Sequence, residues 1–173
     1  MKNRKRGFSL VELLIVLAVI AALIATITPV ALNAIQKAKA TQVGQNLKTL
    51  TSAIENKGYV DGATGISGLT NLADVTRDIS ADYEAYVFPN GSGTYQVFVL
   101  YVKSPVDVSA AKVAEVLAGT LTGDGNAKKT ADADDVTNGA FKLTKTAKTA
   151  LVADATVTPA NGAPYYTFSF TIY

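Results

Sequence analysis

This chain of 173 residues contains no cysteine and no histidine. Without cysteine there is no disulfide, no zinc–thiolate site and no thiol nucleophile. Without histidine the chain lacks the commonest general base and the commonest transition-metal ligand, which excludes Ser-His-Asp and Cys-His catalysis. The sequence also shows no motif for a Ser-Lys or paired-carboxylate enzyme. We therefore predict that the protein is not an enzyme.

Positive charge is scarce outside the N-terminus. The formal net charge is +2, and four cationic side chains lie within the first six residues, so the remaining side chains sum to about −2. Outside this stretch, the nearest candidate for a basic cluster is the series Lys142, Lys145 and Lys148, interleaved with Thr and Ala. We interpret that series as a solvated surface. The distribution predicts no specific nucleic-acid partner.

A long apolar stretch follows the basic N-terminus. No charge occurs from Leu13 to Ala25, and Phe8 to Leu32 spans 25 residues; about 20 are enough to cross the hydrocarbon of a bilayer. The basic residues beside the span should remain on the cytoplasmic side. Glu12 stands inside this apolar segment, where a carboxylate is costly and therefore indicates a functional role.

The segment KRGFSLVELLIVLAVIAALIATITP, which begins at Lys5, resembles the N-terminus of a type IV pilin or a type II secretion pseudopilin. The resemblance implies that residues 1–7 are a leader, that prepilin peptidase cuts between Gly7 and Phe8, and that the new Phe8 amine is methylated. Glu12 takes the place of the fifth mature residue, which acts in assembly. Pro29 falls at mature position 22, where many members of the family carry proline.

Two other interpretations of this segment are open. A cleaved secretory signal would use Ala21-Ala22 or Ala25-Thr26 as its small-residue site. A plain single-span anchor would satisfy the same apolar length. Glu12 argues against the secretory signal because it lies where such a signal needs its apolar core.

Periodicity predicts one long helix over residues 8–57, with its first half in the membrane or the filament core. Val43, Leu47, Leu50 and Ile54 recur at steps of 4, 3 and 4, which places them on one helical face. Gly58 after Lys57 is a typical helix stop. Pro29 removes a backbone donor inside this helix. The resemblance implies that the helix unwinds near Pro29 in filaments; the alternative is a mild kink.

Residues 58–173 are predicted to form a globular antiparallel sheet domain, which gives an α+β, pilin-like fold with the long helix packed on the sheet. Tyr83 to Phe88 and Thr94 to Lys103 read as a hairpin, whose second strand is apolar on both faces and should be central. The residues between Tyr59 and Ser80 read as a connection. Ser109 to Ala118 reads as a short helix and Tyr165 to Tyr173 as a C-terminal strand.

The segment at about 119–163 is rich in Ala, Thr, Lys, Asp and Gly, and we predict an exposed, variable region there. Ala140 to Thr144 and Leu151 to Thr158 are its expected edge strands. Its aspartates are calcium candidates, since calcium prefers several oxygen ligands from a flexible loop, but their spacing does not fit an EF-hand. We therefore predict a solvated loop that holds no metal and needs no cofactor, with calcium binding as the alternative. These aspartates are Asp124, Asp132, Asp134 and Asp135.

The resemblance implies a structural subunit of an extracellular type IV pilus, a helical homopolymer built through the N-terminal helix. The subunit would span the inner membrane once, meet prepilin peptidase and the inner-membrane assembly machinery, and then reach the cell surface. The alternatives are a pseudopilin of type II secretion and a minor pilin with a role in adhesion or DNA uptake. The sequence does not choose between motility, adhesion, DNA uptake and secretion.

Overall fold

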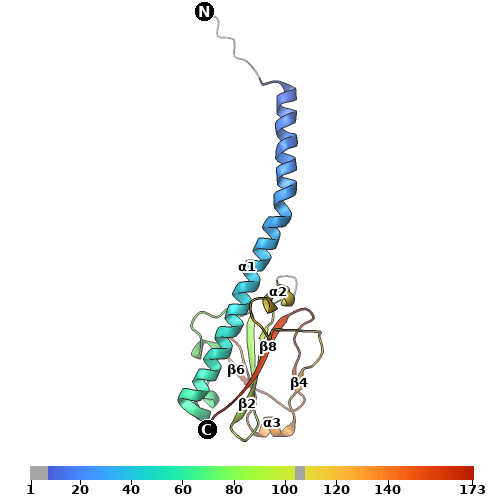
Figure 1. Ribbon diagram of the computed structural model, residues 1–173. Helices are drawn as coiled ribbons and strands as arrows, with labels where there is room; N and C mark the ends of the chain where they lie inside the picture. The colour runs from blue at the N-terminus through green and yellow to red at the C-terminus, as the bar shows by residue number, and fades with distance from the viewer. Residues whose placement is uncertain (1–7, 104–107) are drawn as a thin grey trace, which may run out of the picture. The chain divides into compact units, whose positions relative to one another are not determined.

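A computed structural model of the chain describes residues 8–103 and 108–173 (Figure 1). The predicted leader, residues 1–7 with Gly7, lies outside the described residues. The chain divides into two compact units, one that ends at Lys37 and one that comprises Ala38–Tyr173. We call them the helical unit and the globular unit.

One helix, α1 (Leu10–Ser67), begins in the helical unit and ends in the globular unit. In the helical unit it is apolar on all sides. In the globular unit one side becomes buried, and the predicted face of Val43, Leu47, Leu50 and Ile54 is confirmed, since all four are buried. Lysine, glutamine and asparagine occupy other positions around the helix. The change from apolar residues on all sides to one buried side therefore marks the point at which α1 begins to pack on the sheet.

The predicted helix stop at Gly58 is wrong, because α1 continues to Ser67. Gly58 is buried, and a Cβ placed on it would lie 2.5 Å from Cε2 of Phe170. The glycine thus allows α1 to approach the sheet closely. Among the described residues of α1, only Gly62 has non-helical angles, with φ 65° and ψ −160°. Apart from this kink at Gly62, residues 59–67, expected as a connection, are therefore helical, and a 3-10 helix η1 (Leu72–Asp74) follows.

The main sheet is antiparallel and has six strands in the order β3-β8-β2-β1-β5-β6. The predicted hairpin is confirmed as β1 (Tyr83–Pro89) and β2 (Thr94–Tyr101), with Tyr83 opposite Tyr101. The predicted C-terminal strand is confirmed as β8 (Pro164–Thr171). The remaining strands are β3 (Leu121–Thr122), β5 (Phe141–Leu143) and β6 (Lys148–Ala150).

The central place of β2 is also confirmed, since β1 and β8 flank it. Tyr95, Val97 and Val99 on one face join the core that contains the buried face of α1. Phe98 and Leu100 on the other face join a second core. The α+β fold with a long helix packed on an antiparallel sheet is therefore as predicted.

The prediction of an exposed, variable region at about 119–163 needs correction, because part of this region packs in the second core. This region forms a covering layer with β4 (Lys129–Thr130), α3 (Ala133–Thr137) and β7 (Thr156–Val157), in which β4 pairs with β7. Ala131, Leu151 and Val157 of this layer are buried. The predicted edge strand at Ala140 to Thr144 is instead interior, since β5 lies between β1 and β6. These elements are short and their few apolar residues stand among polar ones, so the sequence shows too little hydrophobic periodicity to predict them.

The predicted helix at Ser109 to Ala118 is present in a shorter form, α2 (Ala110–Ala114). Ser109 occupies the N-cap position, as expected. Ala110 and Val113 are its buried residues, and Val113 belongs to the core that includes α1. This helix therefore extends the core beside the sheet.

Candidate assembly site

The helical unit presents a continuous apolar surface. Every residue from Phe8 to Lys39 is exposed within the single chain, and Leu10, Ile20 and Val30 retain 74%, 46% and 68% of their exposure. By length and composition α1 is able to cross a membrane. Exposed apolar surface on this scale marks a membrane or protein interaction site. The surface therefore needs a bilayer or apolar partners around it.

Glu12 lies at the N-terminal end of this surface, in the first turn of α1. Its Oε2 accepts a hydrogen bond from the backbone N–H of Ser9 at 2.9 Å. The helical ladder begins where Leu13 N–H donates to the Ser9 carbonyl at 3.2 Å. The negative charge is thus held at the positive end of the helix dipole, where it is favourable.

Sequence reasoning missed this capping role, although a signal was present. Ser9-x-x-Glu12 before an apolar run has the pattern of a capping box, in which the third helical residue reaches back to the N-cap backbone. Glu12 therefore has a partner within its own chain. This local role is compatible with a second role in assembly, since a carboxylate accepts several hydrogen bonds.

Phe8 precedes α1, and 79% of its surface is exposed. It lies next to Ser9, the residue whose N–H binds Glu12. An amine created at Phe8 by cleavage would therefore be close in sequence to the Glu12 carboxylate. Gly7, on the other side of the predicted cut, lies outside the described residues.

Pro29 lies within α1, and the helix is continuous through it. Two threonines bind carbonyls in the turns before it: Thr26 Oγ1 donates to Leu23 O at 2.9 Å and Thr28 Oγ1 to Ile24 O at 2.7 Å. Proline cannot donate to the carbonyl four residues earlier, so one ladder bond is lost at Ala25. The break predicted for filaments stays a prediction.

The four aspartates named as calcium candidates are not grouped around one site in the described part of the chain. Asp124 pairs with Lys128 at 2.7 Å, and this hydrogen bond, with that from Asn126 N–H, lowers the pKa of Asp124 to about 2. Asp132 caps α3, since its Oδ1 accepts from Asp135 N–H at 2.7 Å. Asp134 lies in the first turn of α3. Within residues 8–103 and 108–173, no three carboxylates are grouped to hold a metal ion.

Asp135 is the buried member of the acidic group. Its Oδ2 pairs with Lys129 Nζ at 2.8 Å and accepts a hydrogen bond from the N–H of Asp132 at 3.1 Å. Burial, the largest single influence, favours a raised pKa, but these hydrogen bonds and the charge of Lys129 together lower the pKa of Asp135. The absence of a metal or cofactor from this region stays a prediction, with calcium as its alternative.

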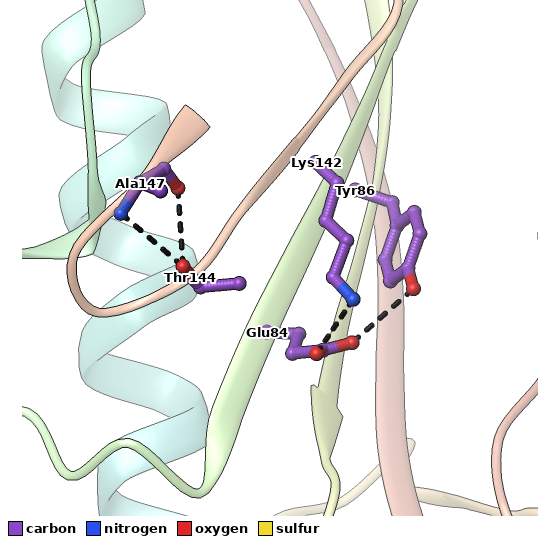
Figure 2. Close-up of polar contacts among 5 residues, drawn as sticks. All are labelled: Glu84, Tyr86, Lys142, Thr144 and Ala147. Carbon is purple, nitrogen blue, oxygen red and sulfur yellow. Dashed lines mark hydrogen bonds and ion pairs between the residues drawn. The ribbon is translucent and has the colours of Figure 1, made fainter. Parts of the chain in front are cut away.

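The lysine series at 142, 145 and 148 does not act as one patch. Figure 2 shows Lys142 Nζ bound to Glu84, at 2.6 Å, while Tyr86 O–H donates to the same carboxylate at 3.2 Å. Lys148 donates to the carbonyl of Ser67 and covers the ring of Phe141. Lys145 is exposed. Two of the three lysines therefore stabilise contacts within the globular unit.

Comparison with known families finds one match. Residues 2–28 match the prokaryotic N-terminal methylation motif, which is the prepilin-type leader of type IV pilins and pseudopilins. Together with the long apolar helix and the antiparallel sheet, this motif supports a type IV pilin-like or pseudopilin protein. The leader implies processing by a prepilin peptidase, and the helix fits membrane insertion before assembly. No curated protein and no solved structure matches the chain.

Proposed function

We propose that the chain is a structural subunit of an extracellular type IV pilus. The observation that carries the proposal is the exposed apolar surface from Phe8 to Ile35, a segment whose first part, to residue 28, belongs to the prepilin-type motif. No residue of this segment is buried in the single chain, so its burial has to come from outside. The bilayer supplies it before assembly, and copies of the same helix supply it in the filament.

In the filament, the copies of α1 keep this surface out of water, where its exposure would cost about 25 cal/mol per Å². Because the bilayer already buries the surface before assembly, close packing between helices drives the step from the membrane to the filament. The globular units then form the outside of the filament, with the covering layer of α3, β4 and β7 among their surfaces. In the cell, the subunit spans the inner membrane once and is taken from it by the assembly machinery.

Glu12 sets the register between copies in this proposal. Its carboxylate pairs with the methylated Phe8 amine of a neighbouring subunit or of its own chain. A buried charge without a partner is costly, and loss of one partner of a buried pair costs about 3–5 kcal/mol. Where the pair joins neighbouring subunits, a subunit that enters the filament out of register would leave both charges unpaired, so this intersubunit pair selects the correct position.

The test is intact-mass analysis of filaments sheared from the cell surface. We expect this chain to dominate the preparation, to lack residues 1–7 and to carry one added methyl group. Retention of the leader in assembled filaments would refute the processing. A correctly processed chain that is absent from surface filaments would instead indicate a pseudopilin, and a trace amount would indicate a minor pilin.

A further inference from the structure

The dipeptide Asn-Gly occurs three times in the chain, as Asn90-Gly91, Asn138-Gly139 and Asn161-Gly162. It is the dipeptide most prone to deamidation, because glycine has no side chain to hinder attack by its own nitrogen on the neighbouring side-chain amide. The three copies have similar surroundings: each asparagine is exposed, and the glycines have φ angles of 75°, 83° and 77°. A difference in reactivity between the three sites would therefore come from their hydrogen bonds.

The sites differ in the backbone N–H of the glycine, whose nitrogen is the attacking atom. Gly139 N–H donates to the carbonyl of Val136 at 3.0 Å, and Gly162 N–H donates to that of Gly123 at 2.7 Å. Within the described part of the chain, Gly91 N–H donates to no protein acceptor, and Gly91 is exposed. A nitrogen whose proton is held in a hydrogen bond has to break that bond before it attacks. Gly91 is therefore the glycine whose nitrogen is free to react.

The side-chain amide of Asn90 is also polarised. Its Oδ1 accepts hydrogen bonds from Ser92 Oγ at 2.8 Å and from Ser92 N–H at 3.3 Å. These donors draw electrons from the amide carbon, and they stabilise the negative charge that develops on the oxygen during attack. The turn between β1 and β2 thus holds an unbound nucleophile next to an activated carbonyl.

We propose that Asn90 is a site of spontaneous deamidation. The nitrogen of Gly91 forms a bond to Cγ of Asn90, its proton goes to the departing amide nitrogen, and the Cγ–Nδ2 bond breaks to release ammonia. Water then opens the cyclic imide that results. Attack of water at Cγ breaks the bond from Cγ to the Gly91 nitrogen and gives aspartate. Attack at the main-chain carbonyl carbon of Asn90 breaks its bond to the same nitrogen and gives isoaspartate.

The modification changes both the charge and the backbone of this turn. Either product carries a carboxylate where the newly made chain has a neutral amide, and isoaspartate also adds a carbon to the main chain. Beside this position the hairpin is closed by the hydrogen bond from Asn90 N–H to Thr94 O at 3.0 Å. The protein therefore gains negative charge at the exposed end of the hairpin as it ages. The inference is independent of the proposed function, since the turn belongs to the globular unit alone.

The experiment follows all three asparagines in the full chain in detergent micelles, at mildly alkaline pH, which favours loss of the amide proton. Peptide mapping by mass spectrometry separates asparagine, aspartate and isoaspartate at each site over time. We expect Asn90 to convert at least about fivefold faster than Asn138 or Asn161, the factor by which the net worth of one hydrogen bond changes a rate. Asn138 is a close control, since a Cβ on Gly91 would lie 3.1 Å from its Oδ1 and both sites meet the same solvent.

The same chain unfolded in denaturant provides the second arm. There all three glycine N–H groups are free, so the three sites should convert at similar rates, and Asn138 and Asn161 should react faster than in the folded chain. Ser92→Ala keeps the Asn-Gly dipeptide but removes the hydroxyl donor, and it should slow conversion at Asn90 alone. Equal rates at the three sites of the folded chain would overturn the proposal. An advantage of Asn90 that persists in the unfolded chain would also overturn it, because the cause would then be the neighbouring sequence and not the fold.

Discussion

At the scale of single residues, two glycines of α1 meet different surroundings. A Cβ on Gly58 would lie 2.5 Å from the ring of Phe170, which is itself only 4% exposed and has little room to move. A Cβ on Gly44 would lie 3.4 Å from Cγ1 of Val116, which is an ordinary contact. The same substitution should therefore have opposite effects at these two positions.

We expect Gly58→Ala to lower the free energy of unfolding of the globular unit by about 1–3 kcal/mol, as overpacking does in cores. Gly44→Ala is the matched control, and it should raise stability by about 0.5–1 kcal/mol because alanine favours the helix. Thermal unfolding of the full chain in detergent, followed by circular dichroism, measures both. A Gly58→Ala chain as stable as wild type would show that α1 does not need this close approach.

The ion pair between Asp135 and Lys129 makes stability depend on pH. The pKa of Asp135 is lowered in the folded chain, so the unfolded chain binds a proton first as the pH falls. The stabilisation is complete above the unfolded pKa of about 3.9 and is lost as the pH falls through the lower folded pKa.

Asp135→Asn should therefore destabilise the globular unit at pH 7 by about 1–3 kcal/mol, and the difference from wild type should shrink in acid. Denaturant unfolding at pH 7, 5 and 3 measures it. Asp134→Asn changes a neighbouring exposed carboxylate in the same helix and should have little effect at any of these values. A deficit that stays constant down to pH 3 would contradict the role of the charge.

At the scale of elements, α1 shows what periodicity predicts and what it misses. The face of Val43, Leu47, Leu50 and Ile54 was predictable because its spacing depends on the helix alone. The end of α1 was not, since Gly58 has the local signature of a stop and its true role depends on Phe170, more than a hundred positions later. Patterns among neighbouring residues predict local structure. They do not show that two segments far apart in the sequence pack closely together.

The prediction at the scale of elements concerns α1 at Pro29. The single chain keeps α1 continuous through Pro29, with Thr26 and Thr28 bound to nearby carbonyls. In the filament we expect helical hydrogen bonds to be lost from about Ala25 to Pro29, which lets the two halves of α1 follow different directions. Pro29→Ala restores the missing donor, and an interior proline costs a helix about 3 kcal/mol.

Cryo-electron microscopy of wild-type and Pro29→Ala filaments makes the comparison. The variant should show unbroken helix from Ala21 through Val43, while wild type shows an interruption. An uninterrupted helix in the wild-type filament would count decisively against the predicted break.

At the scale of the whole molecule, the two units differ in how much of them the sequence predicted. The apolar surface of α1 and the motif around Glu12 are contiguous, so the candidate assembly site was apparent from residues 8–29. The covering layer of α3, β4 and β7 was not, because its strands have two residues each and pair across 25 or more positions.

The last prediction separates two roles of Glu12. In the single chain, the carboxylate caps α1 through Ser9 N–H. In the proposed filament, its charge pairs with the Phe8 amine. Glu12→Gln keeps an oxygen that accepts from Ser9 N–H but removes the charge, whereas Glu12→Ala removes both. If the charge pair governs assembly, both variants should be processed, inserted into the membrane and poorly polymerised.

If capping alone governs assembly, Glu12→Gln should form filaments as wild type does and only Glu12→Ala should fail. The yield of sheared filaments, normalised to the processed subunit in the membrane fraction, distinguishes these outcomes. The expected loss in both variants follows from the cost of about 3–5 kcal/mol for leaving one partner of a buried pair alone. This cost applies to every subunit that is added. Even about 3 kcal/mol per subunit should therefore reduce filament yield far more than it reduces membrane insertion. Normal yield from Glu12→Ala would exclude both roles and leave burial of the apolar surface as the sole requirement.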